Sequence, residues 1–214
     1  MYPSARPFAA LVLAHGAGAG QTSAFMVQTA AELAARGISV ATFDFPYITA
    51  KRSVPDRAPV LEAAWREAID AGRDGLGGVP LFIGGKSMGG RISSHVASQG
   101  GAGTIAGLVL LGYPLHPPGQ PGKRRDAHLP AIAEPMLFVQ GSRDTFGTED
   151  EIRALLPSLQ HATLHAIAGG DHSFKVPGGK ARQEPVFLGV MDTVAEWIRA
   201  AVPPGADSSR RLSA

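Results

Sequence analysis

The chain has 214 residues, of which 44% are hydrophobic and 18% charged, enough for one domain with a sizeable core. Its formal net charge is +2 with acids and bases interspersed, so the composition favours neither a nucleic-acid partner nor a membrane partner. The absence of cysteine excludes disulfides and thiolate chemistry, and it fits a cytoplasmic location.

Six apolar runs along the chain predict buried strands. They lie at 8–14, 38–45, 79–84, 105–112, 136–140 and 162–168. The first run could pass for the core of a signal peptide, but a glycine-rich turn and an amphipathic segment follow it, which favours a strand. No run is long enough to span a bilayer.

Segments with helical spacing separate most of these runs. Their apolar residues recur at i, i+1, i+4 and i+5, within 25–34, 60–69 and 186–198. Near-continuous apolar strands that alternate with helices predict a doubly wound α/β fold, with a parallel sheet of about six strands covered on both faces. We expect a single domain over residues 1–214, in which 203–214 form a frayed tail.

The glycine-rich stretch GGKSMGG, residues 84–90, lies between the third apolar run and a helical segment at 91–97. Two nucleotide-binding motifs do not fit the sequence. A phosphate-binding loop that ends at Ser87 needs glycine where Pro80 stands. A dinucleotide-binding motif that begins at Gly16, in an earlier glycine-rich stretch, needs glycine where Gln21 stands. The sequence therefore does not favour a bound nucleotide.

The motif G-x-S-x-G fits the same stretch, with Gly85 and Gly89 flanking Ser87. In this motif the serine occupies the apex of a sharp strand-to-helix turn, the nucleophile elbow, where the flanking positions must lack bulk. The serine then lies at the positive end of the following helix, which stabilises negative charge. We therefore predict Ser87 as a nucleophile; the alternative is a structural glycine-rich turn.

A serine nucleophile needs a base, and the base needs an acid that orients it. On a fold with this elbow the expected chain order is Ser, then Asp or Glu, then His. Asp144 follows the fifth apolar run and His172 follows the sixth, both at strand ends where open parallel sheets bind ligands. Ser87, Asp144 and His172 are the predicted catalytic triad.

The loop HGAGAG, residues 15–20, follows the first predicted strand and is expected to lie beside the elbow. Its small residues would allow backbone N–H groups to approach a reacting carbonyl. We predict an oxyanion hole made by the N–H groups of Ala17 and Met88, with His15 in a structural role. The other histidines lack metal-ligand spacing, and the sequence implies no cofactor and no metal.

Several charged residues lie near these motifs. Arg91 could bind a substrate carboxylate or pair with an acid. Asp44 is a candidate for supporting the site, and Asp171 is expected to brace the loop that carries His172. The basic run at 123–125 favours a solvated loop over a binding patch.

The motifs GGKSMGGR, VQGSRDTFG and GGDHSF together resemble those of α/β-hydrolases, most closely the small dienelactone-hydrolase-like branch. They further resemble a family that includes testis-expressed hydrolase-like proteins and a subunit of a histone-acetyltransferase complex. The resemblance extends from about residue 8 to about residue 201. It implies an α/β-hydrolase fold, although Lys86 stands where many relatives carry His, Tyr or Glu.

Relatives that hydrolyse long lipids carry a helical lid at the place that corresponds to residues 113–135. Here this segment is rich in proline, glycine and charge, which predicts a long loop with one helical turn and no cap domain. We expect a shallow site that takes short acyl groups.

The sequence thus predicts a serine esterase that acts on small-molecule acyl substrates through an acyl-enzyme. The alternative is a non-catalytic protein-interaction module on a hydrolase scaffold, because a fold does not imply a function.

Overall fold

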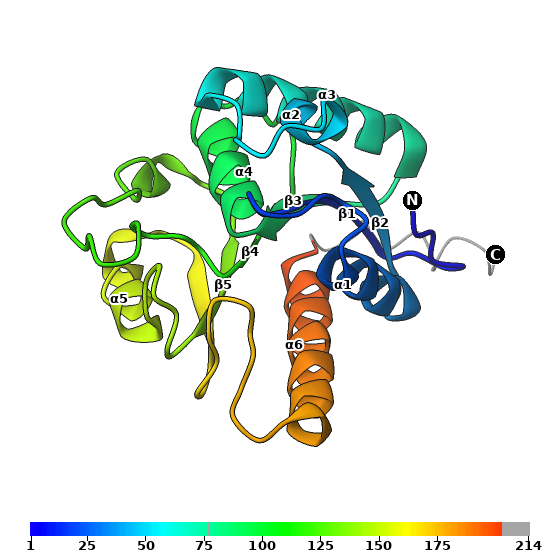
Figure 1. Cartoon of the computed structure of the whole chain (residues 1–214). Helices are drawn as coiled ribbons and strands as arrows, with labels where there is room; N and C mark the ends of the chain where they lie inside the picture. Colours follow the sequence, from blue (N-terminus) through cyan, green and yellow to red (C-terminus); the bar gives the residue numbers. More distant parts are fainter. Residues whose placement is uncertain (77, 203–214) are drawn as a thin grey trace.

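A six-stranded parallel sheet forms the centre of the molecule (Figure 1). The computed structural model describes residues 1–76 and 78–202, so the tail predicted at 203–214 lies outside the described residues. The strand order is β2-β1-β3-β4-β5-β6. The strands are β1 (Ala9–Ala14), β2 (Ile38–Phe43), β3 (Leu81–Lys86), β4 (Gly107–Leu111), β5 (Met136–Gly141) and β6 (Ala162–Ile167). Each predicted apolar run contains or overlaps one of them, which confirms the fold class.

Four long helices cover the two faces of the sheet. In Figure 1, α3 (Ala58–Leu76) and α4 (Met88–Ser98) lie above the sheet, and α1 (Ala24–Ala35) and α6 (Lys180–Ala201) lie below it. All four confirm predicted helical segments. The sequence analysis missed two short helices, α2 (Pro46–Thr49) and α5 (Glu149–Arg153). None of the helices in the described part of the chain has the length and apolar content needed to cross a bilayer.

The central strands contribute to both hydrophobic cores. Along β1, Val12 packs in the core shared with α3 and α4, whereas Leu11 and Leu13 pack in the core shared with α1 and α6. All three side chains are buried. Successive side chains of a strand point to opposite faces, so a sheet covered on both faces requires near-continuous apolar strands.

The segment at 113–135 is a long loop with one short 3-10 turn, η1 (Leu129–Ala131). Leu115, Leu129 and Ile132 are buried against the core on the side of α3 and α4. The segment therefore lies on the body of the protein, and within the described residues there is no cap domain, as predicted.

The strand order reverses between β1 and β3, which are neighbours in the sheet. The chain leaves β1 toward β2 on one side and leaves β3 toward β4 on the other. The segments that follow the two strands consequently diverge and leave a crevice at the carboxyl edge of the sheet, where open α/β sheets bind their ligands.

Candidate active site

Ser87 lies between β3 and α4 in a backbone conformation that few non-glycine residues adopt, with φ 50° and ψ −115°. Such strain costs roughly 1–3 kcal/mol and clusters at functional sites. The Ser87 amide donates a hydrogen bond of 2.9 Å to Leu111 O on β4, which holds the turn against the sheet.

The two glycines of the elbow are required by one neighbouring carbonyl. A Cβ added at Gly89 would lie 2.5 Å from Ala14 O at the end of β1, far below the van der Waals contact distance. A Cβ added at Gly85 would clash with the same oxygen. The elbow therefore sits tightly against β1, and the motif's glycines reflect this close approach as well as the turn.

Three side chains from three separate loops form a hydrogen-bonded chain. His172 Nε2 lies 2.8 Å from Ser87 Oγ, and His172 Nδ1 lies 2.8 Å from Asp144 Oδ2. Because Nδ1 faces a carboxylate, it carries the ring proton, which leaves Nε2 free to accept the hydroxyl proton of the serine. The structure thus brings together the three residues that the sequence analysis grouped.

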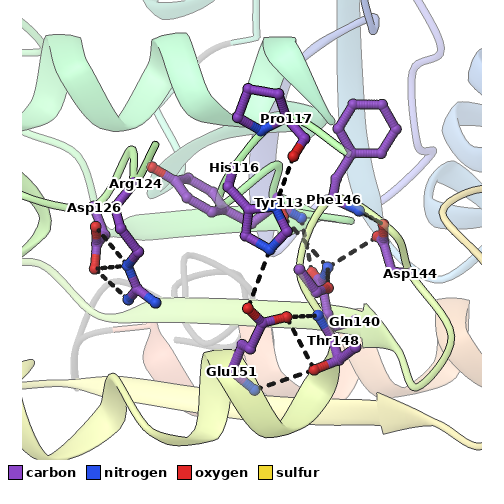
Figure 2. A network of polar contacts seen from close by, with 11 residues as sticks. Tyr113, His116, Pro117, Arg124, Asp126, Gln140, Asp144, Phe146, Thr148 and Glu151 are labelled. Atoms are coloured by element: carbon purple, nitrogen blue, oxygen red, sulfur yellow. Dashed lines mark hydrogen bonds and ion pairs between the residues drawn. The ribbon is translucent and has the colours of Figure 1, made fainter. Parts of the chain in front are cut away.

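A buried glutamine holds Asp144 in place (Figure 2). Gln140 Nε2 donates to Asp144 Oδ2 at 2.9 Å and to Gly147 O at 2.6 Å, and Gln140 Oε1 accepts from the Tyr113 amide at 2.8 Å. The other oxygen of Asp144 accepts from the Phe146 amide at 2.8 Å. The sequence analysis missed Gln140, although a polar residue inside the apolar run 136–140 was a usable signal.

The loop that carries His172 is fixed from several sides. The imidazole lies against the ring of Phe146, with centroids 4.2 Å apart. Asp171 Oδ1 accepts hydrogen bonds from the amides of Ser173 at 2.8 Å and Lys175 at 2.9 Å, so it braces the loop as predicted. Lys86 Nζ donates a hydrogen bond to the carbonyl of His172.

Lys86, which precedes Ser87 at the end of β3, lies among aromatic rings. Its ammonium lies 5.2 Å from the centre of the Phe174 ring and 5.9 Å from that of Phe25. Burial lowers the pKa of Lys86 to about 8, against the opposing influence of the Asp144 and Asp171 charges.

The loop after β1 lies beside the elbow, as the sequence predicted. A Cβ added at Gly16 would lie 3.5 Å from Ser87 Cβ, and Tyr47 OH donates to Ala17 O at 3.0 Å. Both Ala17 and Met88 line the cavity next to Ser87. Within the described residues, neither backbone N–H group donates to a protein acceptor.

His15 and Asp44 support this loop from behind. His15 is buried; its Nδ1–H donates to Gly16 O at 2.7 Å, and its Nε2 accepts from the Phe45 amide at 3.1 Å. Burial lowers the pKa of His15, so the ring is neutral and structural, as predicted. Asp44 Oδ1 accepts from the Gln21 amide at 2.7 Å, which ties the end of the loop to the segment after β2.

A cavity of about 660 Å³ opens beside Ser87. Its walls come from the loop after β1, the start of α1, residues 55–61 and the segment 113–135. Apolar lining is provided by Phe25, Met26, Leu61, Met88 and Phe146. These walls come from the body of the domain and not from a lid; that the site is shallow stays a prediction.

The same cavity contains Arg91 and Arg125. The sequence analysis assigned 123–125 to a solvated loop, which holds for exposed Lys123 and Arg124. It does not hold for Arg125, which is half-buried on the cavity wall. A hydrophobic contact of the following turn, where Leu129 is buried, draws this part of the loop inward.

The remaining histidines are part of the fold, as expected. His116 Nε2 lies 3.1 Å from Glu151 Oε1, and the other carboxylate oxygen of Glu151 accepts from the Thr148 amide in the capping box of α5 (Figure 2). His128 Nε2 lies 2.8 Å from Ser94 Oγ. Of the described histidines, His172 is the one that lines the cavity beside Ser87.

Solved structures share this architecture at low sequence identity. Est1E from Butyrivibrio proteoclasticus, with ferulic acid bound, has a TM-score of 0.71 and 14% identity, over 91% of this chain and 90% of that chain. Dienelactone hydrolase from Anabaena variabilis has a TM-score of 0.71 and 19% identity, over 94% and 89%. An α/β serine hydrolase without a lid from Xanthomonas campestris has a TM-score of 0.67 and 18% identity, over 94% and 85%.

The sequence also matches the model of one protein family. This family, the α/β hydrolase domain, matches residues 7–199, nearly the whole described chain. The narrower resemblance to testis-expressed hydrolase-like proteins stays a prediction. With the elbow, the six-stranded sheet and the site at its carboxyl edge all in place, the chain belongs to the α/β hydrolase domain family.

Proposed function

We propose that this protein is a serine hydrolase that cleaves carboxylic esters or related small acyl compounds. The observation that carries the proposal is the hydrogen-bonded chain from Asp144 through His172 to Ser87, with 2.8 Å at each step, beside an open cavity. The esterase and dienelactone hydrolase among the structural neighbours support the same reaction class.

In the proposed reaction, Ser87 Oγ attacks the carbonyl carbon of the ester and His172 Nε2 takes the hydroxyl proton. Asp144 keeps the Nδ1–H tautomer and stabilises the imidazolium that forms. His172 then protonates the leaving alcohol as the acyl-enzyme forms. Water, activated by His172 in the same way, releases the acid and restores Ser87.

The oxyanion of the tetrahedral intermediate would be stabilised by the N–H groups of Ala17 and Met88. Met88 opens α4, whose first N–H groups have no partner within the helix, and Ala17 lies on the adjacent loop. Gln140 and Lys86 would act by positioning, the first through Asp144 and the second through the loop of His172.

Labelling with a fluorophosphonate probe tests the proposal and separates it from the interaction-module alternative. The wild type should label, and Ser87→Ala should not. With p-nitrophenyl butyrate, Ser87→Ala and His172→Ala should each lower kcat by at least about a thousandfold, whereas Asp144→Asn should lose less.

Ser158→Ala, an exposed serine outside the cavity, is the control and should behave like the wild type. A wild type that neither labels nor hydrolyses any ester would reject the hydrolase. Full activity in Ser87→Ala would reject the assignment of the nucleophile.

A further inference from the structure

We propose that Arg91 and Arg125 form an anion subsite that binds a carboxylate of the substrate a few bonds from the scissile ester. This inference rests on the hydrolase function proposed above and names the chemical class of its substrate: a monoester of a dicarboxylic acid or a similar acidic acyl compound.

Arg91 is a guanidinium without a protein partner in the described part of the chain. Its Nε is buried and makes no hydrogen bond, and its side chain takes part in no ion pair among the described residues. Buried polar groups in native proteins nearly always have a partner, and an unpaired buried charge costs much more than an unpaired neutral group. An unmatched arginine on a cavity wall therefore points to a partner that enters from the cavity.

The carboxylate that acts on Arg91 from within the protein is already engaged. Glu62 Oε1 lies 3.4 Å from His95 Nδ1, and Glu62 Oε2 lies 3.8 Å from Arg66 Nη2. Glu62 is not within ion-pair distance of Arg91. Burial, and after it the charge of Arg125, lower the pKa of Arg91 from its usual value.

Arg125 is held on the same cavity wall by its own backbone. Its amide donates to Leu115 O at 2.9 Å, and its carbonyl accepts from Tyr113 OH at 2.6 Å. Its side chain, too, forms no ion pair with a described residue, in contrast to the neighbouring Arg124, which pairs with Asp126 at 2.6 Å. Two guanidinium groups thus line one cavity, and neither forms an ion pair with a described residue.

The other charged side chains of the cavity have partners within the protein. Lys86 donates to the carbonyl of His172. Asp56, which also lines the cavity, pairs with Arg52 through Oδ1 at 2.7 Å, and its Oδ2 is buried without a hydrogen-bond partner among the described residues. The cationic side chains of the cavity that form no ion pair with a described residue are therefore the two arginines.

The position of Arg91 ties the anion to the reacting centre. Its amide donates to Ser87 O at 3.0 Å, so Arg91 lies in the first turn of α4, the helix that Ser87 directly precedes. A planar guanidinium binds a carboxylate through two parallel hydrogen bonds, which fits a small planar anion attached to the acyl compound.

A matched pair of esters tests the subsite. The charged substrate is mono-p-nitrophenyl adipate and the neutral one is its methyl-capped diester; spontaneous hydrolysis is subtracted for both. For the wild type, kcat/KM should be at least about tenfold higher for the charged ester. In Arg91→Gln the ratio of the two values should fall toward one, and Arg125→Gln should lower it in the same direction.

Arg153→Gln, which removes an exposed arginine on α5, is the matched control and should keep the wild-type ratio. The ratio is taken within each variant, so a general loss of activity does not affect it. A wild-type ratio near one, or an unchanged ratio in Arg91→Gln, would overturn the subsite.

Calorimetric binding of adipamate, a carboxylate that is not an ester, separates the subsite from the hydrolase. Adipamate should bind the wild type at least about tenfold more tightly than neutral adipamide, and this advantage should be lost in Arg91→Gln. Equal binding of the two compounds would overturn the subsite even if esters are hydrolysed. Arg91-dependent binding in a protein that neither labels nor hydrolyses esters would instead overturn the hydrolase and leave the subsite standing.

Discussion

At the scale of single residues, the site depends on side chains that do not react. Gln140 satisfies Asp144 and two backbone groups at once, and Lys86 ties the carbonyl of His172 to the end of β3. Each of the two residues holds one member of the proposed triad by a hydrogen bond from a strand of the sheet. A small displacement of His172 would lengthen its hydrogen bond to Ser87. Gln140 and Lys86 would therefore affect the rate of the proposed reaction without touching the substrate.

Lys86 should make stability depend on pH. Its pKa is about 8 in the folded protein, below the usual 10.5, so between these two pH values the unfolded chain binds a proton that the folded protein has released. The free energy of unfolding of the wild type should therefore rise, relative to Lys86→Met, as the pH increases from 8 to 10.5. Urea denaturation at a series of pH values measures this difference.

Lys175→Met removes an exposed ammonium from the neighbouring loop and controls for the loss of a charge. The difference between the wild type and Lys86→Met is the informative quantity, because every other group titrates in both proteins. Parallel curves over the whole range would show that the buried ammonium does not contribute.

At the scale of elements, the elbow is a contact between β1, β3 and α4. Gly85 and Gly89 both lie against the carbonyl of Ala14 at the end of β1. The strained turn at Ser87 is thus held by packing against a central strand rather than by the turn residues alone. This packing also brings the loop after β1 within reach of Ser87.

Gly89→Ala should be strongly destabilising. The new Cβ would lie 2.5 Å from Ala14 O, a backbone atom that cannot move without disturbing the sheet, and such overpacking costs roughly 1–3 kcal/mol. Gly18→Ala is the matched control, because nothing lies within 4 Å of its added Cβ, and it should stay within about 0.5 kcal/mol of the wild type. Urea midpoints measure both; equal stabilities would mean that α4 can shift away from β1.

At the scale of the whole molecule, the site lies where the loops of a doubly wound sheet diverge. Loops from several separate stretches of the chain enclose the cavity. The segment at 113–135 contributes Pro114 and Arg125 to its lining, while its large apolar residues are buried in the core. The result is a cavity with apolar and cationic sides and without a cap domain in the described part of the chain.

Esters with short acyl chains should be the better substrates. A long chain would gain about 0.8 kcal/mol for each methylene it buries, but here it would have to lie against Arg91 and Arg125 and remove water from their charges. We expect kcat/KM for p-nitrophenyl esters to fall from butyrate to palmitate, without activation at a lipid interface. A rise toward palmitate would show that an apolar channel outweighs the charged lining.

Much of the fold could be predicted because its signals are local. The six strands follow from continuous apolar runs, three of the long helices from the spacing of apolar residues, and α4 from its place after the glycine-rich stretch. A short window of sequence contains each of these signals. Two helices of four and five residues were missed, since so few residues carry little periodicity. The capping box of Thr148 and Glu151 was a local signal that could have predicted α5.

The sequence by itself determined the elbow at Ser87 and the chain order of Asp144 and His172, because the motif and the strand ends are local features. Only the tertiary structure decided that Gln140 holds Asp144, that Lys86 reaches the carbonyl of His172, and that Arg125 lines the same cavity as Arg91. These arrangements depend on how distant segments pack. The two arginines are 34 positions apart in the sequence, and no local signal predicts that they line one cavity, because this depends on the burial of Leu129 and on the path of the loop before it.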